Sequence, residues 1–227
     1  MIARSRAVVS ALFVLLFAPV LTAQENPSLD VRLFRSINNQ QTVEDGVIEF
    51  IDDSSIQLFI AIPVGALLFG VFGDDRSVFD TGVLLAVSQS VTWGTTEIGK
   101  ALTGRQRPFE ALRDVKLKHQ ASARGSSFPS GHTAQAFAIA TMIALRSKPA
   151  VYIPTLLWAT FIGYGRMYVG VHYPTDILGG IVVGAVLSAV VYHYRNDILF
   201  KDEGTYTPPT PLSQASVPLV SITIPFR

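Results

Sequence analysis

The sequence contains no cysteine, and only 15% of its 227 residues are charged. The absence of cysteine excludes disulfide bonds, thiolate metal sites and cysteine nucleophiles. Soluble domains usually have about a quarter of their residues charged. This chain is instead 49% hydrophobic, with a mean hydropathy of +0.38, which is typical of a membrane protein. Its formal net charge of +1 points to no class of partner, and we expect no nucleic-acid binding.

The two ends of the chain differ from its middle. Residues 1–23 combine an early positive charge, an apolar core and a small-residue cleavage site, which predicts a secretory signal. The alternative is a first membrane helix that is retained. Residues 24–55 place apolar residues at helical spacing and predict short amphipathic helices at a membrane surface. Residues 196–227 form a polar tail with a short apolar end, to which we assign no role.

The body of the chain, residues 56–195, predicts the fold. Its apolar runs carry few charges, as membrane-spanning helices require. We expect an all-α, membrane-embedded bundle of five spans, or six if the N-terminal segment is retained, with amphipathic helices at the membrane surface. No internal repeat or second domain is visible. The expected spans are residues 56–73, 78–102, 133–145, 150–164 and 177–194.

Two charged residues lie near the end of the second expected span. Glu97 and Lys100 share one helix face, and charges within a membrane are costly and often functional. The alternative is a plain ion pair that neutralises itself. We expect a direct role for Lys100 and a supporting role for Glu97. The basic loop that follows is either a solvated surface or a means of attracting an anionic substrate.

A second polar group opens the third expected span, in the sequence Pro129-Ser130-Gly131-His132. Ser130 is a favourable N-cap residue, and helix N-termini with Ser and Gly bind anions through their free N–H groups. His132 projects from the same turn. The alternative is an ordinary serine cap beside an incidental histidine.

A third polar group lies between the fourth and fifth expected spans. Arg166 offers a planar, permanently charged group suited to phosphate. Pro174 predicts a helix start, which places Asp176 in the first turn, four residues after His172. The carboxylate can then bind one ring nitrogen of His172 and leave the other free as a nucleophile or base. The alternative is a set of ordinary polar residues at a helix end.

The three polar groups are expected to lie at one end of the bundle. In an up-and-down arrangement the second span ends where the third begins, and the fourth ends where the fifth begins. Unrelated charges would not be expected to meet this condition. We therefore expect a single site.

Together these groups resemble the three signature motifs of the type 2 phosphatidic acid phosphatase superfamily. That superfamily includes membrane lipid phosphatases, bacterial acid phosphatases and vanadium haloperoxidases. The resembling segments are residues 100–108, 129–132 and 166–176, in the expected order and at fitting spacing. One departure is Gly165, because the third motif often has serine there. The change removes a hydroxyl contact but no charge.

The resemblance implies a role for each site residue. His172 would attack phosphorus and form a phosphohistidine, Asp176 would orient its ring, and His132 would protonate the leaving oxygen and then activate water. No metal ion or other cofactor is expected, because fixed cations and helix N–H groups can stabilise the transferring phosphoryl group. The phosphate oxygens would be held by Lys100, Arg107, Ser130, Gly131 and Arg166.

The expected substrate is a phosphate monoester or diphosphate on a membrane lipid. Candidates are undecaprenyl diphosphate, phosphatidic acid, phosphatidylglycerol phosphate and lipid A phosphates. If residue 24 emerges on the exported side, alternating spans place the site at the periplasmic or outer face of a bacterial-type inner membrane. Loops on the cytoplasmic side usually carry more Lys and Arg, whereas here the expected outer loops carry more. The predicted orientation therefore rests on the signal-like start of the chain. The oligomeric state is not indicated.

Three other activities are compatible with the same motifs. They are a soluble exported non-specific acid phosphatase, a vanadate-dependent haloperoxidase and a lipid phosphotransferase. The soluble enzyme would leave the membrane fraction without detergent, and the haloperoxidase would require vanadate. A lipid-binding protein without catalysis fits poorly, because a nucleophile, an acid and several cations are all present.

Overall fold

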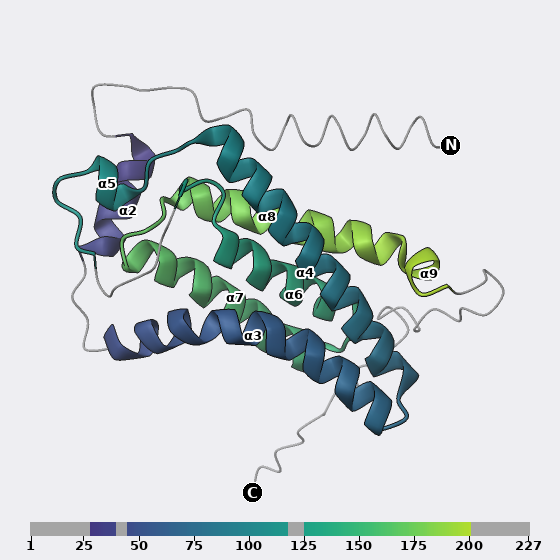
Figure 1. The fold of residues 1–227 in the computed structure, drawn as a ribbon. Helices are drawn as coiled ribbons and strands as arrows, with labels where there is room; N and C mark the ends of the chain where they lie inside the picture. Colours follow the sequence, from purple (N-terminus) through teal and green to yellow (C-terminus); the bar gives the residue numbers. More distant parts are fainter. Residues whose placement is uncertain (1–27, 40–44, 118–124, 201–227) are drawn as a thin grey trace, which may run out of the picture.

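The computed structural model describes residues 28–39, 45–117 and 125–200, and all regular structure in these ranges is helical (Figure 1). The expected all-α bundle is confirmed, since each expected span coincides with a long helix. The long helices are α3 (Asp45–Phe72), α4 (Arg76–Thr103), α6 (Gly131–Arg146), α7 (Pro149–Tyr168) and α8 (Pro174–His193). The short helices are α2 (Leu29–Asn38), α5 (Pro108–Ala111) and α9 (Arg195–Ile198).

The amphipathic region differs from the expectation in one respect. Helix α2 is a separate short helix, as the spacing predicts. The later part of this region, residues 45–55, is not a separate short helix, because α3 starts at Asp45 and runs without a break into the first span. The predicted signal at 1–23 and the tail beyond residue 200 lie outside the described residues.

The outer faces of the long helices are rich in exposed apolar side chains. In water such a surface would be unfavourable, whereas a bilayer solvates it. By length and composition alone, residues 54–72 of α3 and all of α8 could cross a membrane. The other long helices contain more polar residues or are shorter. Exposed apolar residues include Ile60, Val64 and Leu68 of α3, Trp93 and Leu102 of α4, Leu157 and Phe161 of α7, and Leu178 and Val182 of α8.

Helix α6 is central and contacts α3, α4, α7 and α8. It is rich in alanine, and its small side chains let the neighbouring backbones approach closely. The tightest approach is to α8. A Cβ placed on Gly180 would lie only 2.7 Å from the carbonyl oxygen of Ser130, and one on Gly184 would overlap the backbone at Ala134. The glycines of α8 therefore bring its first half against the start of α6.

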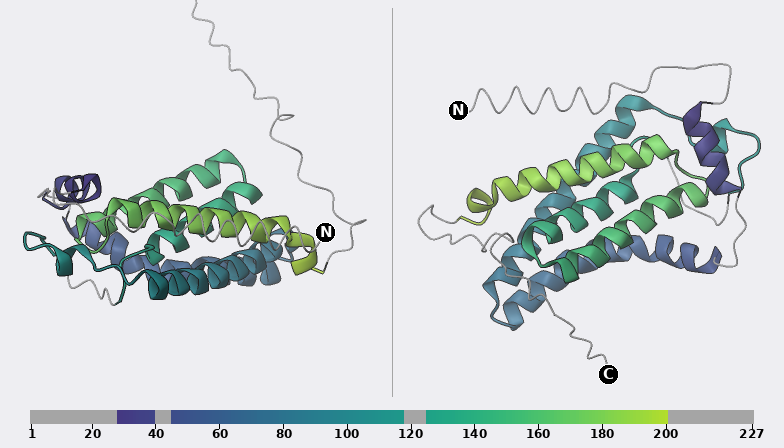
Figure 2. Two further views of the ribbon diagram at one scale, coloured as in Figure 1. Left: turned by 90° about the horizontal axis from the view of Figure 1, so that it is seen from above. Right: turned by 180° about the vertical axis from the view of Figure 1, so that it is seen from behind.

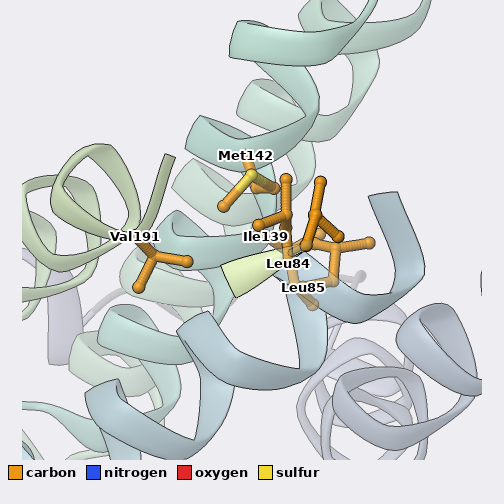
Figure 3. Packing of buried hydrophobic residues seen from close by; sticks show 6 residues of the cluster. Leu84, Leu85, Ile139, Met142 and Val191 are labelled. Carbon is orange, nitrogen blue, oxygen red and sulfur yellow. The ribbon is translucent and has the colours of Figure 1, made fainter. Parts of the chain in front are cut away.

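The two ends of the bundle are built differently (Figures 1 and 2). At one end, short turns at residues 73–75 and 147–148 join the helices. We call this the turn end. A buried apolar cluster from α4, α6, α8 and α9 lies toward it (Figure 3). At the opposite end α4 and α7 finish, α6 and α8 begin, and α2 and α5 lie across them. We call this the loop end.

Candidate active site

The first polar group lies in the last turn of α4. The Lys100 ammonium is 2.6 Å from the Glu97 carboxylate, so the ion pair considered as an alternative is present. Lys100 also faces a second helix, because a Cβ on Gly131 would lie 3.4 Å from its Nζ. Lys100 is therefore held by Glu97 beside the N-terminus of α6. The ion pair with Glu97 therefore does not prevent Lys100 from lying beside the start of α6, where an anion site was expected.

Arg107 comes from the connection after α4 and is 3% exposed. Its Nε donates to the carbonyl oxygen of Gly125 at 2.9 Å. Its Nη1 donates to the carbonyl oxygen of Val171 and lies 3.2 Å from Nε2 of His172. Because a guanidinium can only donate, Nε2 of His172 accepts in this contact, and the ring proton belongs on Nδ1. Burial, followed by the charge of Arg166, lowers the pKa of Arg107.

The second polar group lies at the start of α6, with Ser130 at the N-cap position and fully buried. The Ser130 side chain makes no capping hydrogen bond to the first turn. The Ser130 hydroxyl instead accepts a hydrogen bond from Thr133 Oγ1 at 2.9 Å. The first N–H groups of a helix have no partner within the helix. Because the Ser130 side chain does not cap α6, it does not occupy the first N–H groups of this helix. His132 is in this turn, with its ring edge against Phe59 of α3.

The third polar group joins α7 to α8. Arg166 is 4% exposed in the last turn of α7, and its carbonyl oxygen accepts the N–H groups of Val171 and His172. This turn passes through Gly170, whose φ of 94° favours glycine. The predicted helix start at Pro174 is confirmed, and it places Asp176 in the first turn of α8.

His172 and Asp176 face each other in a buried setting. His172 is 2% exposed, and its Nδ1 lies 3.5 Å from Oδ2 of Asp176. That distance is longer than a normal hydrogen bond. Burial lowers the pKa of His172 to about 4. Asp176 opposes this shift, whereas the positive charges of Arg166 and Arg107 add to it. His172 is therefore neutral at ordinary pH.

Asp176 has partners that the sequence analysis did not identify. Its Oδ2 accepts hydrogen bonds from the backbone N–H of Tyr173, at 2.8 Å, and from the hydroxyl of Ser127. Its Oδ1 accepts from Arg105 Nη1 at 2.6 Å. Arg105 was visible as one charge of the basic loop, but nothing in the sequence separates it from its neighbours. Ser127 carries no sequence signal at all.

The structure brings the three polar groups together at the loop end. His132 lies close enough to Lys100, Arg107, Arg166 and His172 for their charges to act on it. The site therefore combines two histidines, one buried carboxylate and three cations. Within residues 28–39, 45–117 and 125–200, no group of three or more His, Asp or Glu side chains is placed to hold a metal ion.

Comparisons with known proteins identify the family of the chain. A family model described as the PAP2 superfamily matches residues 78–199, more than half of the chain. An undecaprenyl-diphosphatase of Sulfolobus acidocaldarius is 28% identical over 174 residues, which cover 76% of this chain and 82% of that protein.

Two solved structures are similar in fold. The crystal structure of Aquifex aeolicus LpxE has a TM-score of 0.64 at 26% identity, covering 76% of this chain and all of that one. A transmembrane PAP2-type phosphatidylglycerolphosphate phosphatase from Bacillus subtilis also has a TM-score of 0.64, at 24% identity, covering 85% of this chain and 96% of that one. The fold is thus that of membrane-embedded phosphatases, and the resemblance found in the sequence is confirmed.

Proposed function

Because the chain belongs to the PAP2 superfamily, we propose that it is a membrane phosphatase that hydrolyses a phosphate monoester or diphosphate on a lipid. We further propose that the reaction needs no metal ion and proceeds through a phosphohistidine. One observation supports this above the others. The buried, neutral His172 presents Nδ1 to Asp176 and Nε2 to Arg107, within a cluster of cations.

The cations and the start of α6 would bind the phosphate. Lys100, Arg107 and Arg166 would provide positive charge, and the hydroxyl of Ser130 and the N–H of Gly131 would add donors. Phosphoryl transfer depends mainly on positioning and charge stabilisation, which such a cluster supplies. In the structure Arg107 Nη1 contacts Nε2 of His172. A bound phosphate would draw that donor to its own oxygen and uncover the nitrogen.

The two histidines would divide the chemistry. Nε2 of His172 attacks phosphorus, the bond from phosphorus to the leaving oxygen breaks, and His132 gives that oxygen a proton. Asp176 stabilises the positive charge that forms on the His172 ring. In the second step His132 takes a proton from water, the water oxygen attacks phosphorus, the bond from phosphorus to Nε2 of His172 breaks, and inorganic phosphate leaves. Together the two steps return His172 and His132 to their starting protonation.

A lipid substrate is supported by where the site lies. The bundle exposes apolar side chains on its outer faces, and the site is at one end of it, next to the amphipathic helix α2. Two of the similar proteins carry names that refer to undecaprenyl diphosphate and to phosphatidylglycerol phosphate. We therefore propose a lipid phosphate at the membrane surface, drawn from the four candidates named above.

We propose a multi-pass location in a bacterial-type inner membrane, with the loop end facing the periplasm or exterior. Because the chain has no cysteine, its orientation in the membrane can be tested with variants that carry one introduced cysteine each. Gln106→Cys lies at the loop end and Asp74→Cys at the turn end, and both positions are exposed. In intact cells or spheroplasts a membrane-impermeant maleimide should label only Gln106→Cys. Labelling of Asp74→Cys alone would reverse the orientation.

The activity test is phosphate release by detergent-purified protein in the presence of chelator. The panel runs from undecaprenyl diphosphate through phosphatidic acid, phosphatidylglycerol phosphate and lipid A to a soluble aryl phosphate. We expect turnover of a lipid, resistant to chelator. Turnover of the aryl phosphate alone would favour the acid-phosphatase alternative. Phosphate appearing on a second lipid would identify a transferase, and loss of activity in chelator would contradict a metal-independent reaction.

A further inference from the structure

A chain of charged contacts links α2 to the candidate active site. Arg105 Nη1 donates to Oδ1 of Asp176 at 2.6 Å and to Oγ1 of Thr175 at 2.7 Å. Its Nη2 donates to Oδ2 of Asp30, on α2, at 2.6 Å. The guanidinium also lies over the Tyr173 ring, 4.1 Å from the centroid. Arg105 is thus fixed on several sides and directs one donor at the carboxylate that faces His172.

Asp30 is itself held on the site elements. Its Oδ1 accepts the N–H of Thr175 at 2.9 Å, and its Oδ2 accepts the Thr175 hydroxyl at 2.7 Å. Two further residues of α2 anchor the helix nearby. Phe34 is fully buried against Tyr173, and Asn38 donates to the carbonyl oxygen of Tyr168 at 2.9 Å. The position of Asp30 relative to α8 is therefore well determined.

We propose that Arg105 and Asp30 are positioning residues for the active site. Arg105 holds Oδ1 of Asp176, so that Oδ2 stays opposite Nδ1 of His172, and Asp30 holds Arg105. The inference rests on the proposed function, because it assigns His172 the role of nucleophile. It adds two residues to the reaction that touch neither phosphate nor the reacting atoms.

Electrostatics gives Arg105 a second effect on the same pair. Burial lowers the pKa of Arg105, but Asp176 and Asp30 together raise it above its ordinary value, so it stays charged. This positive charge partly offsets the carboxylate of Asp176, the group that favours protonation of His172. The other charged or titratable groups that act on His172 are Arg107, Arg166 of α7 and His132 of α6.

Removing Arg105 should therefore change turnover rather than binding. Its donors are directed at Asp176, Thr175 and Asp30, away from the phosphate cluster formed by Lys100, Arg107 and Arg166. A loosened Asp176 would orient His172 less well and lower kcat while KM stays unchanged. With less positive charge nearby, the pKa of His172 would rise, and the acid limb of kcat/KM would move to higher pH.

The experiment compares Arg105→Met, Arg105→Lys and Asp30→Asn with Asp114→Asn in the full chain. Asp114 pairs with Arg35 at 2.9 Å and forms a more exposed attachment of α2 that does not touch Asp176. We expect Arg105→Met to lower kcat by about 10- to 100-fold, as for partners that orient a reacting group. Arg105→Lys should recover part of the loss, Asp30→Asn should show a smaller loss of the same kind, and Asp114→Asn should match the wild type.

Three outcomes would overturn the proposal. One is an Arg105→Met enzyme with kcat within about twofold of wild type and an unmoved acid limb. Another is a loss that appears mainly in KM, since that would make Arg105 a phosphate ligand. The third is an equal loss in Asp30→Asn and Asp114→Asn, which would mean that only attachment of α2 matters. Should Arg105→Met fail to fold, Asp30→Asn carries the same test.

A second readout separates this inference from the proposed function. The chain has only four histidines, so side-chain ¹⁵N NMR can follow the tautomer and titration of His172, assigned by loss of its signal in His172→Ala. If wild-type protein releases no phosphate from any substrate, the proposed function fails. The NMR titration still decides the inference. A raised His172 pKa in Arg105→Met supports it, and an unchanged pKa overturns it.

Discussion

The two ends of the bundle are formed by the same helices but bury different kinds of side chain. Toward the turn end, α4, α6 and α8 contribute Leu84, Ile139, Met142 and Val191 to a buried apolar cluster (Figure 3). At the loop end, the helices and their connections bury two guanidinium groups, one imidazole and a carboxylate, those of Arg107, Arg166, His172 and Asp176. Burying charge is costly even when it is paired. The comparison teaches that the turn end is packed mainly with apolar side chains, whereas the loop end combines an apolar cluster with the charged groups of the candidate site.

Charge is treated differently at the two ends of helix α4. Near the turn end, Asp80 pairs with Arg76, whose side chain is 70% exposed. At the loop end, Lys100 is more enclosed and pairs with Glu97 beside the start of α6. An exposed partner contributes little and is easily screened. The charge at the turn end is therefore expected to be structural, and the charge at the loop end to act on a ligand.

The largest expected effect is on kcat, and it distinguishes a histidine at the loop end from one at the turn end. His172→Ala removes the proposed nucleophile and should lower kcat by about 10⁴- to 10⁶-fold. His193→Ala makes the same change at the turn end of α8, where the side chain is exposed, and should leave kcat unchanged. Phosphate release and thermal unfolding in detergent measure both. Appreciable turnover by a folded His172→Ala protein would contradict the assignment of His172 as the nucleophile.

The next comparison uses two arginines. Arg166→Ala should lower kcat/KM by about 10²- to 10³-fold, as when one donor to a developing charge is lost. Arg146→Ala removes a side chain that bonds Ser77 and Thr81 at the turn end. It should reduce thermal stability with little change in kcat/KM. Steady-state kinetics on the best lipid substrate distinguish the two, and similar kinetic losses would contradict the division between the ends.

The free energy of unfolding should depend on the apolar cluster toward the turn end more than on the outer faces of the helices, and two leucines test this. Leu84 is fully buried in the apolar cluster, and Leu84→Ala should lower the free energy of unfolding by about 2–5 kcal/mol. Leu157 is 62% exposed on the outer face of α7, so Leu157→Ala should change it much less. Denaturant titration in detergent measures the difference. Equal losses would show that Leu157 is packed against something other than lipid or detergent.

The smallest expected effect is on the pH dependence. The proposed reaction needs neutral His172, and burial lowers its pKa to about 4. The acid limb of kcat/KM for free enzyme should therefore lie near pH 4, below the ordinary imidazole value of about 6.5. Between these values the unfolded chain binds more protons at this side chain than the folded chain. Its contribution to stability should fall as pH drops through that window. An acid limb near pH 6.5 would contradict a buried, neutral histidine.

Sequence reasoning worked best where structure is local. Apolar runs and helix-start residues such as Pro174 depend on neighbours a few positions away, so the long helices and their order could be predicted. It placed Ser130 at the N-cap of α6, as the structure does, but did not find the hydrogen bond that its hydroxyl accepts from Thr133. It also separated residues 45–55 from the first span, whereas α3 is one helix that includes both. A change in polarity along a helix surface does not interrupt the backbone hydrogen bonds of that helix.

By itself, the sequence determined the helical class, the membrane-like composition and the convergence of three polar groups on one end, since alternating helices leave no other arrangement. Only the tertiary structure decided which partners those groups have. Asp30 meets Arg105 across 75 residues of chain, and Arg105 meets Asp176 across 71. Such contacts depend on how α2 and the loop between α4 and α6 cross the end of the bundle. No local pattern encodes that path, because it is set by packing among segments far apart in the chain.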